Sequence, residues 1–89
     1  GAVGAYQIHL CYMQDAGNAF KPDDRYDRAK SREMVRLYMK RYATYNRLGR
    51  EPTFEDIARI HNGGLYGWKR ESTKPYWEKV KKVLYGSKE

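Results

Sequence analysis

A histidine and an asparagine stand directly before two glycines in the segment ARIHNGG, residues 58–64. Imidazole and carboxamide groups both donate and accept hydrogen bonds, so His61 and Asn62 could bind a polar ligand. Gly63 and Gly64 carry no side chains and would let a bulky ligand approach the backbone beside the histidine. The plainer interpretation, which this segment alone favours, is a helix end at which Gly63 supplies the left-handed residue.

Several other kinds of catalytic or metal site are excluded by the residue types present. The chain has no phosphate-binding P-loop, no His-Glu-x-x-His zinc motif and no nucleophile-elbow sequence. His9 and His61 are the only histidines and Cys11 is the only cysteine, so neither a Cys-based zinc motif nor an internal disulfide can form. We therefore expect no metal and no cofactor.

The elements that must position His61 and Asn62 are predicted to be helices, and the fold class is mainly α. Four helices with little or no sheet indicate a single small domain over residues 1–89. Proline, aspartate and glycine residues mark the breaks between these elements. The expected elements are helices at residues 9–16 and from residue 27 or 31 to 45, a helix opening at Thr53, a last helix from about Thr73, a loop at 18–24 and an extended piece at 5–8.

Apolar residues at helical spacing predict which faces are buried. The long second helix presents one such face, and the last helix presents another. On the third helix His61 shares a face with Phe54, Ile57 and Ala58, so its ring is expected to point toward the core or a cleft. The predicted apolar stripes are Val35, Tyr38, Met39, Tyr42 and Tyr45 on the second helix, and Tyr76, Trp77, Val80, Val83 and Leu84 on the last.

The charge balance favours a polyanionic partner. Eighteen Lys and Arg against 11 Asp and Glu give a formal net charge of +7, which suits nucleic acid, an anionic membrane surface or a bacterial wall. The second helix carries a basic row at four-residue intervals. No apolar run approaches the length of a membrane span, and no signal peptide is visible. One cysteine is compatible with cytoplasmic synthesis, and the localisation stays open. The basic row consists of Arg28, Arg32, Arg36 and Lys40.

Four segments, taken together, resemble the invertebrate-type, destabilase-like lysozymes and their relatives in bacteria and phages. They are GAYQI at residues 4–8 with Tyr12 and DAG at 15–17, VRLYMKRYA at 35–43, ARIHNGG at 58–64 with Gly67, and Thr73 with Tyr76, Trp77, Lys79 and Val80. They follow the family order across nearly the whole chain, and ARIHNGG is the most specific of them.

The resemblance implies a small lysozyme-like domain that cleaves the β-1,4 bond between N-acetylmuramic acid and N-acetylglucosamine in peptidoglycan. Tyr6, Gln7 and Ile8 would form one wall of the sugar-binding cleft, by backbone as much as by side chain. His61 and Asn62 would bond to the sugar or to the catalytic acids, and Gly63 and Gly64 would leave room for it. The expected partner is peptidoglycan or a chitooligosaccharide.

The family's catalytic Glu and Asp have no match in this chain. Glycoside hydrolysis normally needs two carboxylates flanking the bond, and the resemblance places both before Gly1. The chain is therefore interpreted as the C-terminal portion of such a domain, N-terminally incomplete, with its catalytic residues unknown. Asp15, Asp23 and Asp24 are not expected to replace them, nor are the helix-opening Glu55 and Asp56.

Departures from the family pattern suggest a cysteine-poor branch. Phe54 and Trp68 stand where animal members usually carry cysteines, so aromatic packing is expected to replace the disulfides. This composition resembles the bacterial and phage relatives.

Two other classes of function stay open from the sequence. One is a non-catalytic module that keeps the fold and binds glycan, or serves as a structural part of a larger assembly. The other is a basic nucleic-acid-binding domain, which the charge and the interleaved aromatic residues would suit. Strong salt dependence of RNA or DNA binding without affinity for glycan would identify the latter.

Overall fold

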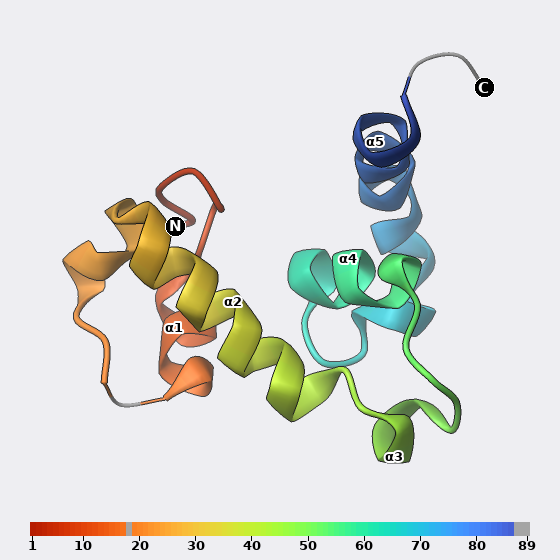
Figure 1. Cartoon of the computed structure of the whole chain (residues 1–89), viewed down its shortest axis with the longest axis horizontal. Helices are drawn as coiled ribbons and strands as arrows, with labels where there is room; N and C mark the ends of the chain where they lie inside the picture. Colours follow the sequence, from red (N-terminus) through yellow and green to blue (C-terminus); the bar gives the residue numbers. More distant parts are fainter. Residues whose placement is uncertain (18, 87–89) are drawn as a thin grey trace. The chain divides into compact units, whose positions relative to one another are not determined.

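The computed structural model describes residues 1–17 and 19–86. Asn18, the first residue of the predicted loop, lies outside them. Within this part the chain is mostly helical, which confirms the mainly α prediction (Figure 1). The elements are α1 (Leu10–Ala16), the 3-10 helix η1 (Pro22–Tyr26), α2 (Arg28–Tyr42), α3 (Tyr45–Leu48), α4 (Phe54–Gly63), the 3-10 helices η2 (Gly67–Lys69) and η3 (Glu71–Thr73), and α5 (Lys74–Tyr85).

The chain divides into two compact units, Gly1–Arg41 and Tyr42–Glu89. The expectation of one domain over residues 1–89 stays a prediction. Among the described residues, the β structure is limited to one antiparallel bridge, between Val3 and Ile8. No helix in the described ranges is long and apolar enough to cross a membrane.

In the first unit, α1 packs against α2 through two stacked tyrosines. The rings of Tyr12 and Tyr38 are parallel within 4°, with centroids 3.8 Å apart, and both side chains are buried. Met34 on α2 is fully buried, as is Ile8 just before α1. The predicted stripe on α2 missed Met34 because tertiary packing rotates the buried face toward residues 31, 34 and 38.

The predicted long helix is wrong at its C-terminal end. α2 stops at Tyr42, and Tyr45 lies in the separate short helix α3 with 58% of its surface exposed. Thr44 caps α3, since its hydroxyl accepts a hydrogen bond from the backbone N–H of Arg47. The extended conformation of Thr44 therefore ends the first helical segment and starts a second one, although the apolar spacing continues through both.

In the second unit, α4 begins with the predicted capping box. The Thr53 hydroxyl accepts from the Asp56 amide, and the Asp56 carboxylate accepts from the Thr53 amide at 2.8 Å. The buried side of α4 carries Ala58, Arg59 and Ile60. Phe54 is 66% exposed, so the expectation that its packing replaces a disulfide is wrong.

The stripe predicted on α5 is buried only in part. Tyr76, Trp77 and Val80 are half-buried, whereas Val83 is 85% exposed and Leu84 is 52% exposed. The first turns of α5 lie beside α4, and its last turns extend beyond it (Figure 1). Periodicity alone could not show where the neighbouring helix ends.

Candidate functional site

Residues 3–8 form a tight turn, so the extended piece predicted at residues 5–8 is wrong. The Val3 amide donates to the Ile8 carbonyl at 3.1 Å, and the Ile8 amide donates back to Val3 at 2.9 Å. Within the turn, the Gln7 amide donates to the Gly4 carbonyl at 3.1 Å. Tyr6 is half-buried, Gln7 is exposed and the Ile8 side chain is fully buried. The Ile8 side chain is therefore buried away from any ligand, and its backbone N–H and C=O both bond within the protein.

Gln7 has an unusual backbone conformation for a residue with a side chain. Its φ is +52°, in the left-handed region, which costs a non-glycine residue about 1 kcal/mol. Its own carboxamide Nε2 donates to the Gly4 carbonyl at 2.9 Å. Such backbone strain persists only where the surrounding structure enforces it, and it is found most often at functional sites.

The 3-10 helix η1 holds this turn in place. A Cβ on Gly4 would lie 2.0 Å from the Arg25 carbonyl oxygen, so only glycine permits the approach. The Arg25 guanidinium donates to the carbonyls of Ile8 at 3.2 Å and Gly1 at 3.3 Å. Arg25 is in turn positioned by buried Ser31, whose hydroxyl donates to its carbonyl at 2.9 Å.

His61 and Asn62 lie in the last turn of α4. Asn62 is exposed and His61 is half-buried, which fits the expectation that His61 points away from open water. The His61 ring lies 6.3 Å from the Tyr76 ring of α5, tilted by 40°. Burial raises the pKa of the Tyr76 phenol above its usual range, so this phenol stays a neutral hydrogen-bonding group.

The two glycines of ARIHNGG have different tasks. Gly63 is helical, and a Cβ there would meet the Thr73 methyl at 2.4 Å. Gly64 ends the helix with φ +85°, and its amide donates to the Ile60 carbonyl at 2.8 Å. The expectation that Gly63 supplies the left-handed residue is therefore wrong, because Gly63 is helical and makes room for Thr73, while Gly64 has the positive φ that ends the helix.

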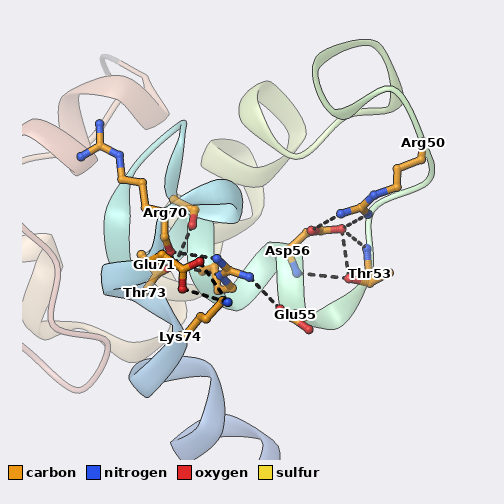
Figure 2. A network of polar contacts seen from close by, with 10 residues as sticks. Arg50, Thr53, Glu55, Asp56, Arg70, Glu71, Thr73 and Lys74 are labelled. Atoms are coloured by element: carbon orange, nitrogen blue, oxygen red, sulfur yellow. Dashed lines mark hydrogen bonds and ion pairs between the residues drawn. The ribbon is translucent and has the colours of Figure 1, made fainter.

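Arg59, which the sequence analysis did not single out, organises the segment after these glycines. It is 7% exposed, and its Nε donates to the Thr73 hydroxyl at 2.8 Å. Its terminal nitrogens bond to the Arg70 carbonyl at 2.8 Å and to the Glu55 carboxylate at 2.7 Å. Figure 2 shows the contacts around Thr73 and Arg70. The sequence held one sign of this role, since Arg59 and Thr73 both belong to segments that resemble the family.

Gly67 completes this arrangement. A Cβ at this position would lie 2.0 Å from the Arg59 carbonyl oxygen, and the Gly67 carbonyl accepts from the Thr73 hydroxyl at 2.6 Å. Segment 63–73 is thus locked against α4, which fixes the helix end that carries His61 and Asn62.

Three carboxyl groups, those of Glu33, Asp56 and Glu71, are poorly suited to act as a general acid because their pKa values are lowered. Burial opposes ionisation of Asp56, but hydrogen bonds from the Arg50 guanidinium and from Thr53 outweigh it and lower the pKa of this carboxyl (Figure 2). The pKa values of Glu33 and Glu71 are lowered by bonds from neighbouring cations. A glycosidase acid needs a raised pKa.

Residues 1–17 and 19–86 also contain no cluster of side chains that could hold a metal ion.

The basic row predicted on the second helix lies on α2 as an exposed face. Arg36 is paired with Glu33, and the remaining three cations are exposed. Solvation keeps the repulsion along such a row to a few tenths of a kcal/mol per pair, so the row is available to an anionic surface.

The family model described as Destabilase matches residues 1–83. A lysozyme of Magallana gigas is 40% identical over 84 residues, which cover 89% of this chain and 58% of that protein. The invertebrate-type lysozyme of Ruditapes philippinarum is 38% identical over 84 residues, covering 92% of this chain and 60% of that protein. The crystal structure of Tapes japonica lysozyme matches with a TM-score of 0.80 and 36% identity, over 92% of this chain and 67% of that one. The chain thus spans about three fifths of the first two relatives.

Proposed function

Because the chain belongs to the destabilase family of invertebrate-type lysozymes, we propose that it is the C-terminal portion of a lysozyme-like glycoside hydrolase. The proposed substrate is peptidoglycan, cleaved at the β-1,4 bond between N-acetylmuramic acid and N-acetylglucosamine. The single cysteine supports placement in a cysteine-poor branch of the family, such as that of the bacterial and phage relatives.

The end of α4 is the observation that carries this proposal. An exposed carboxamide and a half-buried imidazole, Asn62 and His61, stand on a helix end that Arg59, Gly67 and Thr73 hold rigid. Polar groups fixed in this way can bond to sugar hydroxyl and acetamido groups at little entropic cost. His61 and Asn62 are the proposed sugar-binding residues of this unit, with Gly63 and Gly64 shaping the backbone beside them.

The turn at residues 3–8 supplies the second proposed set of contacts. Tyr6, Gln7 and Ile8 belong to the family-like GAYQI segment, and Gln7 is held in a strained conformation. The Tyr6 ring and the Gln7 backbone would contact the sugar, while buried Ile8 anchors the turn. This assignment rests on the family resemblance together with the strain.

The catalytic pair is proposed to come from protein that precedes residue 1. The Asp56 carboxyl, which is 2% exposed, has a lowered pKa and is committed to Arg50. Protonating the leaving oxygen requires a carboxylic acid that keeps its proton near neutral pH. An upstream Glu and Asp would satisfy that requirement, whereas Asp56 would not.

Calorimetric titration of the chain with a chitooligosaccharide tests the binding site. His61→Ala is expected to weaken the affinity about tenfold, since a positioned hydrogen bond to the sugar would be lost. His9→Ala is the matched control, since His9 is the only other histidine and its side chain is exposed. Equal affinity of the two variants would remove His61 from the site.

Hydrolysis is tested on the protein as its source makes it, after its intact mass has been measured. Expected products from purified peptidoglycan are fragments with N-acetylmuramic acid at the reducing end, identified by mass spectrometry. A mass equal to that of residues 1–89, with glycan binding but no products, would favour the non-catalytic glycan-binding module, which the lowered carboxyl pKa values also suit. Salt-sensitive RNA or DNA binding without glycan affinity would favour a nucleic-acid-binding domain.

A further inference from the structure

Three cations and three aromatic rings alternate on one surface of the second unit. The Arg47 guanidinium lies 5.4 Å from the ring centroid of Tyr42 and 5.6 Å from that of Tyr66. The Lys69 ammonium lies 5.0 Å from the Tyr66 centroid and 5.5 Å from that of Trp68. The Arg50 guanidinium lies 5.9 Å from the Trp68 centroid. These six residues are called the cation–aromatic surface below.

The two arginines of this surface are engaged with the protein. Arg47 donates to the carbonyls of Tyr42 at 2.8 Å and Leu65 at 2.9 Å, so it ties two segments together. Arg50 forms a bidentate pair with Asp56, which balances its charge. Both guanidinium groups therefore act mainly as supports for the rings.

Lys69 is different, because its ammonium group is exposed and has no carboxylate partner among the described residues. Its position is set by two aromatic rings rather than by an ion pair. Cation–π attraction of this kind is worth about 0.5–1 kcal/mol at an exposed site. It holds the charge in place without neutralising it, and so leaves the ammonium able to bind an anion.

The rings beside Lys69 offer an apolar contact next to that charge. Tyr66 is 48% exposed, and Trp68 is half-buried with its indole Nε1 buried and lacking an acceptor in the described part of the chain. Trp68 thus contributes its ring face and not a hydrogen bond. The C–H face of a pyranose ring is apolar enough to pack on an exposed aromatic ring, as ligand pockets commonly arrange.

We propose that the cation–aromatic surface binds a carboxylate-bearing sugar, whose ring packs against the exposed part of the Tyr66 side chain while its carboxylate accepts hydrogen bonds from Lys69. This inference rests on the proposed function and specifies its substrate, since it assigns recognition of the acidic sugar of the glycan to these residues. One unpaired cation fits one carboxylate. A nucleic-acid strand would instead need a series of cations along its phosphates.

The test compares two disaccharides with the intact chain, N-acetylglucosaminyl-N-acetylmuramic acid and the neutral dimer of N-acetylglucosamine. Lys69→Met keeps most of the aliphatic stem and removes the charge. It is expected to weaken binding of the acidic disaccharide about tenfold at low salt and to change binding of the neutral one less than twofold. Lys82→Met, an exposed lysine of α5 in the same unit, is the matched control and should change neither.

A second pair of variants tests the ring. Tyr66→Phe should keep the affinity for the acidic disaccharide within about twofold, whereas Tyr66→Leu should weaken it about fivefold. Circular dichroism spectra that match the parent chain show that these variants fold.

Each other outcome overturns the inference in a recognisable way. If Lys69→Met weakened the binding of both disaccharides equally, Lys69 would not recognise the carboxylate. If it weakened the binding of neither, Lys69 would not belong to a binding site. If His61→Ala still weakens chitooligosaccharide binding, the proposed function survives that failure. Binding of neither sugar by the parent chain would overturn both proposals. If Lys69→Met weakened binding of a single-stranded oligonucleotide more than binding of the acidic disaccharide, the surface would be assigned to nucleic acid.

Discussion

The two turns that contain or adjoin the proposed sugar contacts, residues 3–8 and 63–73, both depend on a glycine that lets another backbone segment approach closely. They are stabilised by different contacts. In each, a glycine lets a carbonyl oxygen approach to 2.0 Å from where a Cβ would stand: Arg25 O beside Gly4 and Arg59 O beside Gly67. The first turn is then secured by Arg25, whose guanidinium donates to three backbone carbonyls. The second is secured by an arginine buried among a carboxylate, a hydroxyl and a carbonyl.

The first turn therefore contains the strained backbone, and the second contains the contacts that make the fold rigid. The first turn contains Gln7 in a left-handed conformation, and exposed hydrogen bonds hold it. The second contains no strained non-glycine residue among those described, and its polar contacts are buried. We expect changes in the second turn to cost folding free energy, and changes at Gln7 in the first turn to affect binding more than folding.

The largest effect is expected from Gly67→Ala. A methyl group would collide with the Arg59 backbone, which cannot move without disrupting α4, so we expect a loss of about 4 kcal/mol of unfolding free energy. Both tryptophans, Trp68 and Trp77, lie in the second unit, so tryptophan fluorescence in denaturant titrations reports on this change. Gly49→Ala is the control, since Gly49 has φ +78° but open space around it and should lose only about 1 kcal/mol. Similar losses in both variants would contradict the close-approach argument.

Arg59→Met is expected to cost about 3 kcal/mol, because it removes the donor to the buried Thr73 hydroxyl and to the Arg70 carbonyl and leaves the Glu55 carboxylate without its partner. The measurement is again the unfolding midpoint followed by tryptophan fluorescence. Lys74→Met removes a charge from the exposed pair with Glu71 in the same unit and should leave the unfolding midpoint nearly unchanged. If Arg59→Met were equally mild, the buried network would not be what stabilises the second turn.

Asp56→Asn should cost about 2 kcal/mol at pH 7, where the charged capping carboxylate is lost. The folded-state pKa of Asp56 is lowered, so its contribution is complete above the unfolded value near 4 and disappears as pH falls through the folded value. The parent chain should therefore lose stability between about pH 5 and pH 2 more steeply than the variant. Parallel pH profiles of unfolding free energy would show that Asp56 makes no such contribution.

The smallest effect is expected at Gln7, and it has the opposite sign. Gln7→Gly removes the left-handed strain and should raise stability by up to about 1 kcal/mol, measured by far-UV circular dichroism in denaturant. The same variant is expected to weaken chitooligosaccharide binding severalfold, since the turn becomes freer. Gln7→Asn, which tolerates the same φ, should lose less affinity. A destabilised Gln7→Gly variant would show that the side-chain bond to Gly4 matters more than the strain.

Much of the local structure could be predicted because its causes are local. The capping box of Thr53 and Asp56 was visible as a threonine followed three residues later by an acid, and it is confirmed. The helices themselves followed from apolar spacing and the positions of glycine and proline. The two family-like segments that contain His61 and Gln7 were also found by sequence pattern, and their role in binding stays a prediction.

Contacts between distant residues could not be predicted in this way. The exposure of Phe54 and Val83 depends on where the neighbouring elements stop, which helical periodicity does not encode. The helical state of Gly63 depends on Thr73, ten residues later, packing onto it. Lys69 and Arg47 were two among 18 cations until folding placed them on the same tyrosine ring.

The sequence by itself determined the helical class, the capping box of α4 and the family, because these depend on residue type and on spacing within a few turns of chain. Only the tertiary structure decided which arginines are buried, which glycines are required by close approach, and which cations stay unpaired. The physical reason is that burial and pairing are properties of surfaces brought together from distant segments. Arg59 and Lys69 have similar charge, yet Arg59 is paired with Glu55 within the fold and Lys69 has no carboxylate partner among the described residues.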